Sequence, residues 1–175
     1  GLLREEPPAG EGIGAFRAEV LAVEYATVAG RLSEIGRAFF PDIAIHFGLA
    51  SACSGFRLER TARNSHVHAR PDQAGAMPAA PLVCAGPETL PSTLPLAAIA
   101  EGLAAAGLPV EWSDDAGGYL CNTVFTLSAA HACDGLRPTM AGFVHVPPPE
   151  AMPAADLAAG ARIIVDTCAR AWRGG

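Results

Sequence analysis

Short apolar segments alternate with helical patterns along most of this chain, and that order restricts the possible folds more than any other feature. Strand-like segments occupy residues 18–25, 43–49, 109–112 and 141–146. Helical patterns lie between and after them, over residues 28–39, 92–106, 121–133 and 155–172. This order predicts an α/β fold, with a largely parallel sheet that is covered by helices on both faces.

The segments differ in how strongly their sequence patterns predict a helix, a strand or a loop. Val28, Leu32, Ile35 and Phe39 recur at helical spacing, and Pro41 ends the pattern. Residues 43–49 form a continuous apolar run that is typical of a strand buried on both faces. Residues 1–14 and 60–91 are rich in Gly, Pro or polar residues, so we expect loops there, the second one long and irregular.

Composition limits the possible functions. A chain of 175 residues fits a single domain over 1–175, and its net charge of -6 argues against a nucleic-acid partner. All 12 basic residues are Arg, which excludes a Schiff-base lysine and a P-loop lysine. No secretory or membrane-spanning pattern is evident. The 5 cysteines are odd in number and lack a CxxC pair, which favours the reducing cytoplasm over a disulfide framework or a cysteine zinc site.

Cys121 is the candidate nucleophile. It lies where a Gly-rich turn meets the start of a predicted helix, and the free N–H groups of a first helical turn stabilise an anion. A thiol in that place is more easily ionised, and the same N–H groups can receive an oxyanion. The alternative is a buried structural cysteine, which is the commoner fate of this residue type.

His145 and Glu59 are the candidate partners of this thiol. His145 lies near the end of a strand that three prolines terminate, and strand ends in open α/β sheets face the ligand crevice. A histidine there can deprotonate a thiol, and a carboxylate such as Glu59 can orient the imidazole. The alternatives are a histidine merely satisfied near the surface and a surface glutamate paired with Arg60.

Other polar residues suggest weaker possibilities. His66 and His68 are separated by one residue and could bind a metal from one face of a strand, but no third ligand follows at a familiar spacing. His46 and His131 have no context that singles them out. The glycines over residues 48–55 lack the GxGxxG spacing of a dinucleotide site.

Several motifs together resemble the pyroglutamyl peptidase I family of cysteine peptidases. LERTARN (58–64) resembles the family's ERVAxN motif, SDDAGGYLCN (113–122) resembles S-x-TAGTFVCN, and GFVHVPPPE (142–150) resembles GFIHIPxLPE. IHFGLA (45–50), ARPDQAG (69–75) and STLPL (92–96) also resemble family segments in the same chain order. The resemblance covers roughly residues 18–172.

The resemblance implies a three-layer α/β/α sandwich that associates as a homodimer or homotetramer. It implies removal of N-terminal pyroglutamyl residues from peptides, without a metal or cofactor. Cys121, His145 and Glu59 then correspond to the catalytic triad, and Tyr119, Leu120, Leu49 and Arg70 are the expected substrate-binding residues.

Some positions depart from the family pattern. The family's opening strand and TGFxPF-type loop have no counterpart here, and we expect them upstream of Gly1. Gly118 and Tyr119 replace Thr and Phe beside the nucleophile. Two alternatives follow: a catalytically impaired member that acts as a binding or structural protein, and a hydrolase of another lactam or amide.

Overall fold

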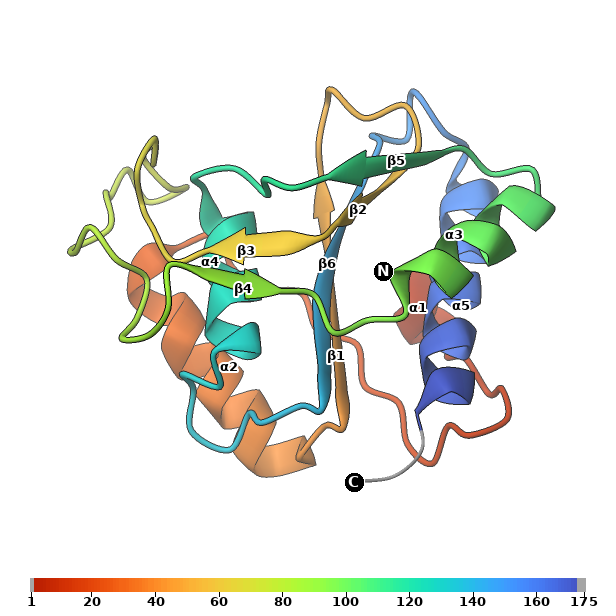
Figure 1. Ribbon diagram of the computed structural model, residues 1–175, viewed down its shortest axis with the longest axis horizontal. Coiled ribbons are helices and arrows are strands. Elements are labelled where there is room, and N and C mark those ends of the chain that lie inside the picture. Colours follow the sequence, from red (N-terminus) through yellow and green to blue (C-terminus); the bar gives the residue numbers. More distant parts are fainter. Residues whose placement is uncertain (1, 173–175) are drawn as a thin grey trace.

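The central sheet of the molecule contains four strands in the order β1-β6-β2-β5. The computed structural model describes residues 2–172, and Figure 1 shows its elements. The strands are β1 (Ile43–Leu49), β2 (Phe56–Glu59), β5 (Val110–Ser113) and β6 (Met140–Val146). The β1/β6 and β2/β5 pairs are parallel, whereas β2 and β6 are antiparallel. A separate two-stranded sheet joins β3 (Thr61–Arg63) to β4 (Thr89–Pro91).

Helices cover both faces of the central sheet, which confirms the predicted three-layer α/β fold (Figure 1). One layer contains α2 (Tyr25–Phe39) and α4 (Leu120–Ala129). The other contains α3 (Leu96–Ala105), α5 (Ala154–Ala171) and the short α1 (Leu2–Glu5). None of the helices in the described part of the chain has the length and apolar character needed to cross a membrane.

Alternating side chains of the strands supply two cores, one on each face of the sheet. Val144 of β6 packs with Phe56, Leu58 and Ile164 on the α3/α5 side. Its neighbour Phe143 points to the other face and packs with Phe125 of α4, with Ala62 and Leu90 of the small sheet, and with Ala116 of the loop before α4. The sheet therefore joins the two helical layers through adjacent residues of one strand.

Two local expectations differ from the structure. Residues 18–23 do not form a strand, because they are separated from β1 by a cleft that both segments line, and a strand needs a hydrogen-bonded neighbour. The helix predicted from Ser92 begins only at Leu96. Before it, the Thr93 backbone N–H donates to the Ala141 carbonyl at 3.0 Å, so these residues follow β6 instead of a helix axis.

The loop expected over residues 1–14 is wrong in part, because Leu2–Glu5 form the short helix α1. The other expected loops agree more closely. Residues 6–24 contain no helix or strand, and the long stretch from 64 to 88 is irregular. The small β3/β4 sheet at the ends of that stretch is the regular structure that the polar composition concealed. Helix α2 ends as predicted before Pro41, with Phe40 in the left-handed conformation at φ 47°.

Candidate active site

Three elements bring the predicted triad together. Glu59 is the last residue of β2, His145 is the penultimate residue of β6, and Cys121 is the second residue of α4. Because β2 and β6 are antiparallel neighbours, Glu59 lies opposite Phe143 and only two residues from the level of His145. The sheet register thus places the carboxylate and the imidazole on adjacent strands.

Glu59 orients the imidazole of His145. The Nδ1 atom of His145 and the Oε1 atom of Glu59 are 2.7 Å apart, and both residues are buried. The second carboxylate oxygen, Oε2, has no hydrogen-bond partner within residues 2–172. A buried carboxylate at this distance fixes the ring and stabilises its protonated form. The alternative pairing of Glu59 with Arg60 is wrong, because Arg60 pairs with Asp114 at 2.7 Å.

The imidazole of His145 also interacts with the thiol of Cys121. Burial acts to lower the pKa of His145, but hydrogen bonds to Cys121 and Glu59 outweigh it and raise the pKa to about 9. The histidine is therefore predominantly protonated near neutral pH. In contrast, burial raises the pKa of Cys168 to about 12, as expected of an inert core thiol.

The thiol is placed by the start of α4 and by two close glycine contacts. Tyr119 is the extended N-cap residue of α4, which leaves Cys121 in the first turn among free backbone N–H groups. Gly118 packs against the backbone of Val67 and His68 so closely that a Cβ atom would overlap them. A Cβ on Gly48 of β1 would lie only 2.9 Å from Cys121 Sγ. Gly48 therefore provides the space that the sulfur occupies.

Gly48 is a site residue that the sequence pattern did not single out. It lies opposite His145 in the parallel β1/β6 register. Its only signal in the sequence is a glycine inside an apolar strand, which often marks the close approach of another group.

All four predicted substrate-binding residues line the cleft onto which Cys121 and His145 open. Leu49, Arg70, Tyr119 and Leu120 share its wall with Cys121 and His145, and the cleft has a volume of about 1380 Å³. The guanidinium carbon of Arg70 lies 4.4 Å from the centre of the Tyr119 ring, which is a cation–π contact. Leu49 is 68 % exposed at the mouth of the cleft. Their placement supports substrate contact, which stays a prediction.

His66, His46 and His131 have structural partners, the last through the Pro138 carbonyl at 3.0 Å, whereas His68 is exposed and lines the cleft. The two ring nitrogens of His66 face the Ala80 carbonyl at 2.8 Å and the Thr123 hydroxyl at 3.2 Å. His46 faces the Ser128 hydroxyl at 2.8 Å, and burial lowers its pKa to about 4, so this ring is neutral. Within residues 2–172, no group of three potential ligands is placed to hold a metal ion.

The arrangement is typical of one class of protein: a thiol at a helix start, interacting with a histidine that a buried carboxylate orients, is the arrangement found in cysteine hydrolases. The sequence comparisons agree with that class. The family model described as pyroglutamyl peptidase matches residues 15–171, and the chain belongs to this family.

Relatives and solved structures give the extent of the similarity. The pyrrolidone-carboxylate peptidase of Pyrococcus furiosus is 43% identical over 108 residues, which cover 61% of this chain and 52% of that protein. That of Streptomyces coelicolor is 34% identical over 180 residues, 97% of this chain and 82% of the relative. Several of the curated matches, the first among them, span only about half the length of the relative.

Solved structures are similar over almost the whole chain. A mutant pyrrolidone carboxyl peptidase (E192V) from Pyrococcus furiosus superposes with a TM-score of 0.89 at 27% identity, covering 98% of this chain and 90% of that one. The pyrrolidone carboxyl peptidase from Thermus thermophilus gives a TM-score of 0.81 at 28% identity, covering 95% and 89%. The resemblance found in the sequence motifs is thereby confirmed.

Proposed function

We propose that this protein is a cysteine exopeptidase that removes N-terminal pyroglutamyl residues from peptides. The observation that carries the proposal is the 2.7 Å contact of Glu59 with His145, whose imidazole interacts with Cys121 and shares one cleft with it. Membership of the pyroglutamyl peptidase family supplies the substrate class.

In the first half of the reaction, the Cys121 sulfur attacks the carbonyl carbon of the pyroglutamyl residue. The oxyanion that forms lies near the backbone N–H groups of the first turn of α4, which stabilise negative charge. Protonated His145 gives its proton to the departing amine, and the C–N bond breaks. The shortened peptide leaves, and the pyroglutamyl group remains on sulfur as a thioester.

Water completes the reaction. Neutral His145 accepts a proton from a water molecule, the hydroxide attacks the thioester, and the C–S bond breaks. Free pyroglutamate leaves, and the proton on His145 restores the starting state. Throughout, Glu59 keeps Nδ1 of the ring engaged, so that the opposite face stays directed at the thiol. Thiol, imidazole, carboxylate and water suffice for every step.

Turnover of a fluorogenic pyroglutamyl amide by the wild-type and Cys121→Ala proteins tests the proposal. We expect Cys121→Ala to lower kcat/KM by about 10³-fold or more, because the covalent route is lost. The matched control is Cys84→Ala, which removes a half-buried thiol outside the cleft and is expected to keep activity within about twofold. Full activity in Cys121→Ala would contradict the proposal.

One observation favours a second candidate, a hydrolase of another lactam or amide. The cleft runs from Cys121 past β1 to residues 12–23, which is far more space than a five-membered lactam ring needs. A panel of fluorogenic amides with larger acyl groups distinguishes the two. If a larger amide gives the higher kcat/KM while Cys121→Ala is inactive on it, the second candidate replaces the first.

A catalytically impaired, binding or structural role predicts a different result: no turnover of any amide in the panel and slow alkylation of Cys121. The cytoplasmic location and the homodimer or homotetramer expected from the sequence stay predictions. The strand and loop expected upstream of Gly1 stay predictions as well.

A further inference from the structure

The loop that joins β1 to β2 lies directly beside the catalytic histidine. Because the sheet order is β1-β6-β2, this loop, residues 50–55, must pass over the carboxyl end of β6. The Ala50 backbone N–H donates to the carbonyl of Val146, the residue after His145, at 3.0 Å. The same cleft that Cys121 and His145 line is also lined by Ala50, Ser51 and Ala52. The loop therefore forms one wall of the presumed substrate site.

A glutamate on another strand anchors the far end of this loop. The Oε1 atom of Glu111, in β5, accepts hydrogen bonds from the Ser54 backbone N–H at 2.7 Å, the Ser54 hydroxyl at 2.8 Å and the Gly55 backbone N–H at 3.2 Å. With the Ser54 backbone N–H as the largest contributor, these contacts and Arg57 hold the pKa of Glu111 at about 2. The anchor is thus charged at every pH at which the protein is expected to work.

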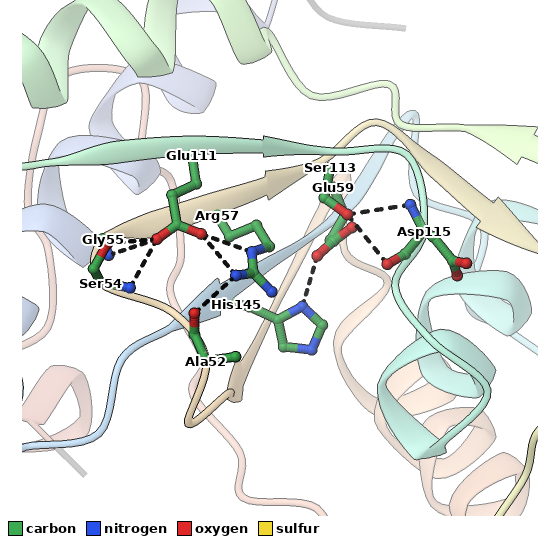
Figure 2. A network of polar contacts seen from close by, with 9 residues as sticks. All are labelled: Ala52, Ser54, Gly55, Arg57, Glu59, Glu111, Ser113, Asp115 and His145. Carbon is green, nitrogen blue, oxygen red and sulfur yellow. Dashed lines mark hydrogen bonds and ion pairs between the residues drawn. The ribbon is translucent and has the colours of Figure 1, made fainter.

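Arg57 completes the anchor from β2. Its Nε and Nη2 atoms both contact Glu111 Oε2, at 2.8 and 2.7 Å, and Nη2 also donates to the Ala52 carbonyl at 3.1 Å. Figure 2 shows Arg57 between Glu111 and His145, with Ala52 and Ser54 held on the loop side. Arg57 is in register with Glu111 on one neighbouring strand and with His145 on the other.

This geometry differs from that of an ordinary surface ion pair. Both side chains are only about a quarter exposed, at 26% and 27%. Within residues 2–172, every other hydrogen bond of these two side chains goes to residues 52, 54 or 55, so the effect of the pair is concentrated on one loop. In the part of the chain that the structure describes, no side-chain hydrogen bond joins either residue to the triad, and Glu59 contacts His145 directly at 2.7 Å.

We propose that Arg57 and Glu111 are positioning residues that hold the 50–55 loop as a wall of the substrate cleft, and thereby determine how tightly substrate binds. This inference rests on the proposed function. Loss of the pair frees the loop but leaves Glu59, His145 and Cys121 in place. Substrate affinity then falls, and the chemical step is largely retained.

Steady-state kinetics on the pyroglutamyl amide test the part of the proposal that concerns substrate binding. The variants are Glu111→Ala, Glu111→Gln and Arg57→Met. We expect Glu111→Ala and Arg57→Met to raise KM about 10-fold with kcat within about threefold, the pattern of lost substrate binding. Glu111→Gln keeps an acceptor for Ser54 and Gly55, so it should raise KM less. A fall in kcat without a rise in KM would overturn the proposal.

Asp114→Asn is the matched control. The Arg60–Asp114 pair also joins the β2 and β5 sides of the sheet, at 2.7 Å, but it holds no part of the loop. We expect the KM and kcat of Asp114→Asn to stay within about twofold of the wild-type values. A KM as high as that of Glu111→Ala would show that any charge lost near these strands has the same effect, and would contradict a specific role for Glu111.

A measurement that needs no substrate keeps this inference separate from the proposed activity. Hydrogen exchange of the backbone amides of residues 50–55 should be faster in Glu111→Ala and Arg57→Met than in wild type, with exchange elsewhere in β1 and β6 unchanged. Unchanged exchange in the loop would overturn the proposal, even in an active enzyme. If the wild-type protein is inactive on pyroglutamyl amides, faster exchange together with faster alkylation of Cys121 by a bulky maleimide, but not by iodoacetamide, still supports it.

Discussion

His145 holds the triad together at the scale of single residues. Its ring is hydrogen-bonded to Glu59 and also interacts with the Cys121 thiol, and these two groups raise its pKa to about 9 although burial opposes them. A pKa raised above the ordinary value of 6.5 stabilises the fold fully below pH 6.5. That contribution is lost as the pH rises through 9, and so is the proton that the proposed mechanism assigns to the leaving amine.

Glu59→Gln tests this electrostatic role. Gln keeps an oxygen acceptor for Nδ1 but removes the negative charge, so the pKa of His145 should fall. We expect the alkaline limb of the pH profile of kcat/KM, near pH 9 in wild type, to move down by about 1–2 pH units. An NMR titration of the His145 ring measures the same shift directly. An unmoved alkaline limb and an unmoved titration would show that Glu59 does not set this pKa.

At the scale of elements, the site depends on how closely β1 and α4 approach each other. The approach is possible because β1 has no side chain at Gly48, where a Cβ would lie 2.7 Å from Cζ of Phe143 and 2.9 Å from Cys121 Sγ. The thiol thus lies between a helix start and a strand backbone. The added Cβ would meet the Cys121 sulfur on one side and the buried Phe143 ring on the other, and few side-chain rotations in a packed core relieve such an overlap.

Gly48→Ala should therefore displace the sulfur. We expect kcat to fall about 10-fold or more, because displacing a reacting group by an ångström is enough to lose most of its effect. The rate of Cys121 alkylation measures the same displacement without substrate. Gly30→Ala in α2 is the control: its Cβ meets nothing within 4 Å, and Ala favours the helix by about 0.5–1 kcal/mol, so kcat should stay at the wild-type value. Unchanged kcat in Gly48→Ala would refute the crowding argument.

The elements also show what the sequence can and cannot predict. Helical periodicity and prolines suffice for α2, and a continuous apolar run suffices for β1, because both signals are local. The strand predicted over residues 18–25 is wrong, since alternation does not supply a hydrogen-bonded neighbour. The mixed direction of the sheet, with β2 antiparallel to β6, depends on contacts between distant segments and was not predicted.

The residues of the site divide in the same way, into those with a local sequence signal and those that depend on contacts between distant segments. Cys121, His145 and Glu59 were predicted because each lies in a motif that resembles one of the family's, in the same chain order, whereas the position of each residue alone left a structural alternative open. The Arg57–Glu111 pair has no such motif: the two residues are 54 positions apart, and only the β2/β5 register makes them neighbours. Gly48 is likewise identified only when the distance to Cys121 is known. Residues that act through register need the fold before they can be recognised.

At the scale of the whole molecule, the two cores share one sheet. Ile164 of α5 is buried in the core on one face, and Leu127 of α4 is buried on the side of α2. Strand β6 connects the faces through Val144 and Phe143, which are adjacent in sequence and belong to opposite cores. Loss of either helical layer would expose a face of the same strand to water, so the layers should not unfold separately.

Ile164→Ala and Leu127→Ala test whether the chain is one cooperative unit. Each removes a buried side chain from a different face, and we expect each to lower the free energy of unfolding by about 2–5 kcal/mol. In urea, circular dichroism and tryptophan fluorescence should follow one common transition in both variants, shifted to lower denaturant with a similar slope. Leu82→Ala, at a side chain that is 53% exposed, is the control and should change the free energy by no more than about 0.5 kcal/mol. If Ile164→Ala splits the curve into two transitions and Leu127→Ala shifts only one of them, the α3/α5 layer unfolds on its own and the single-domain prediction for residues 1–175 is wrong.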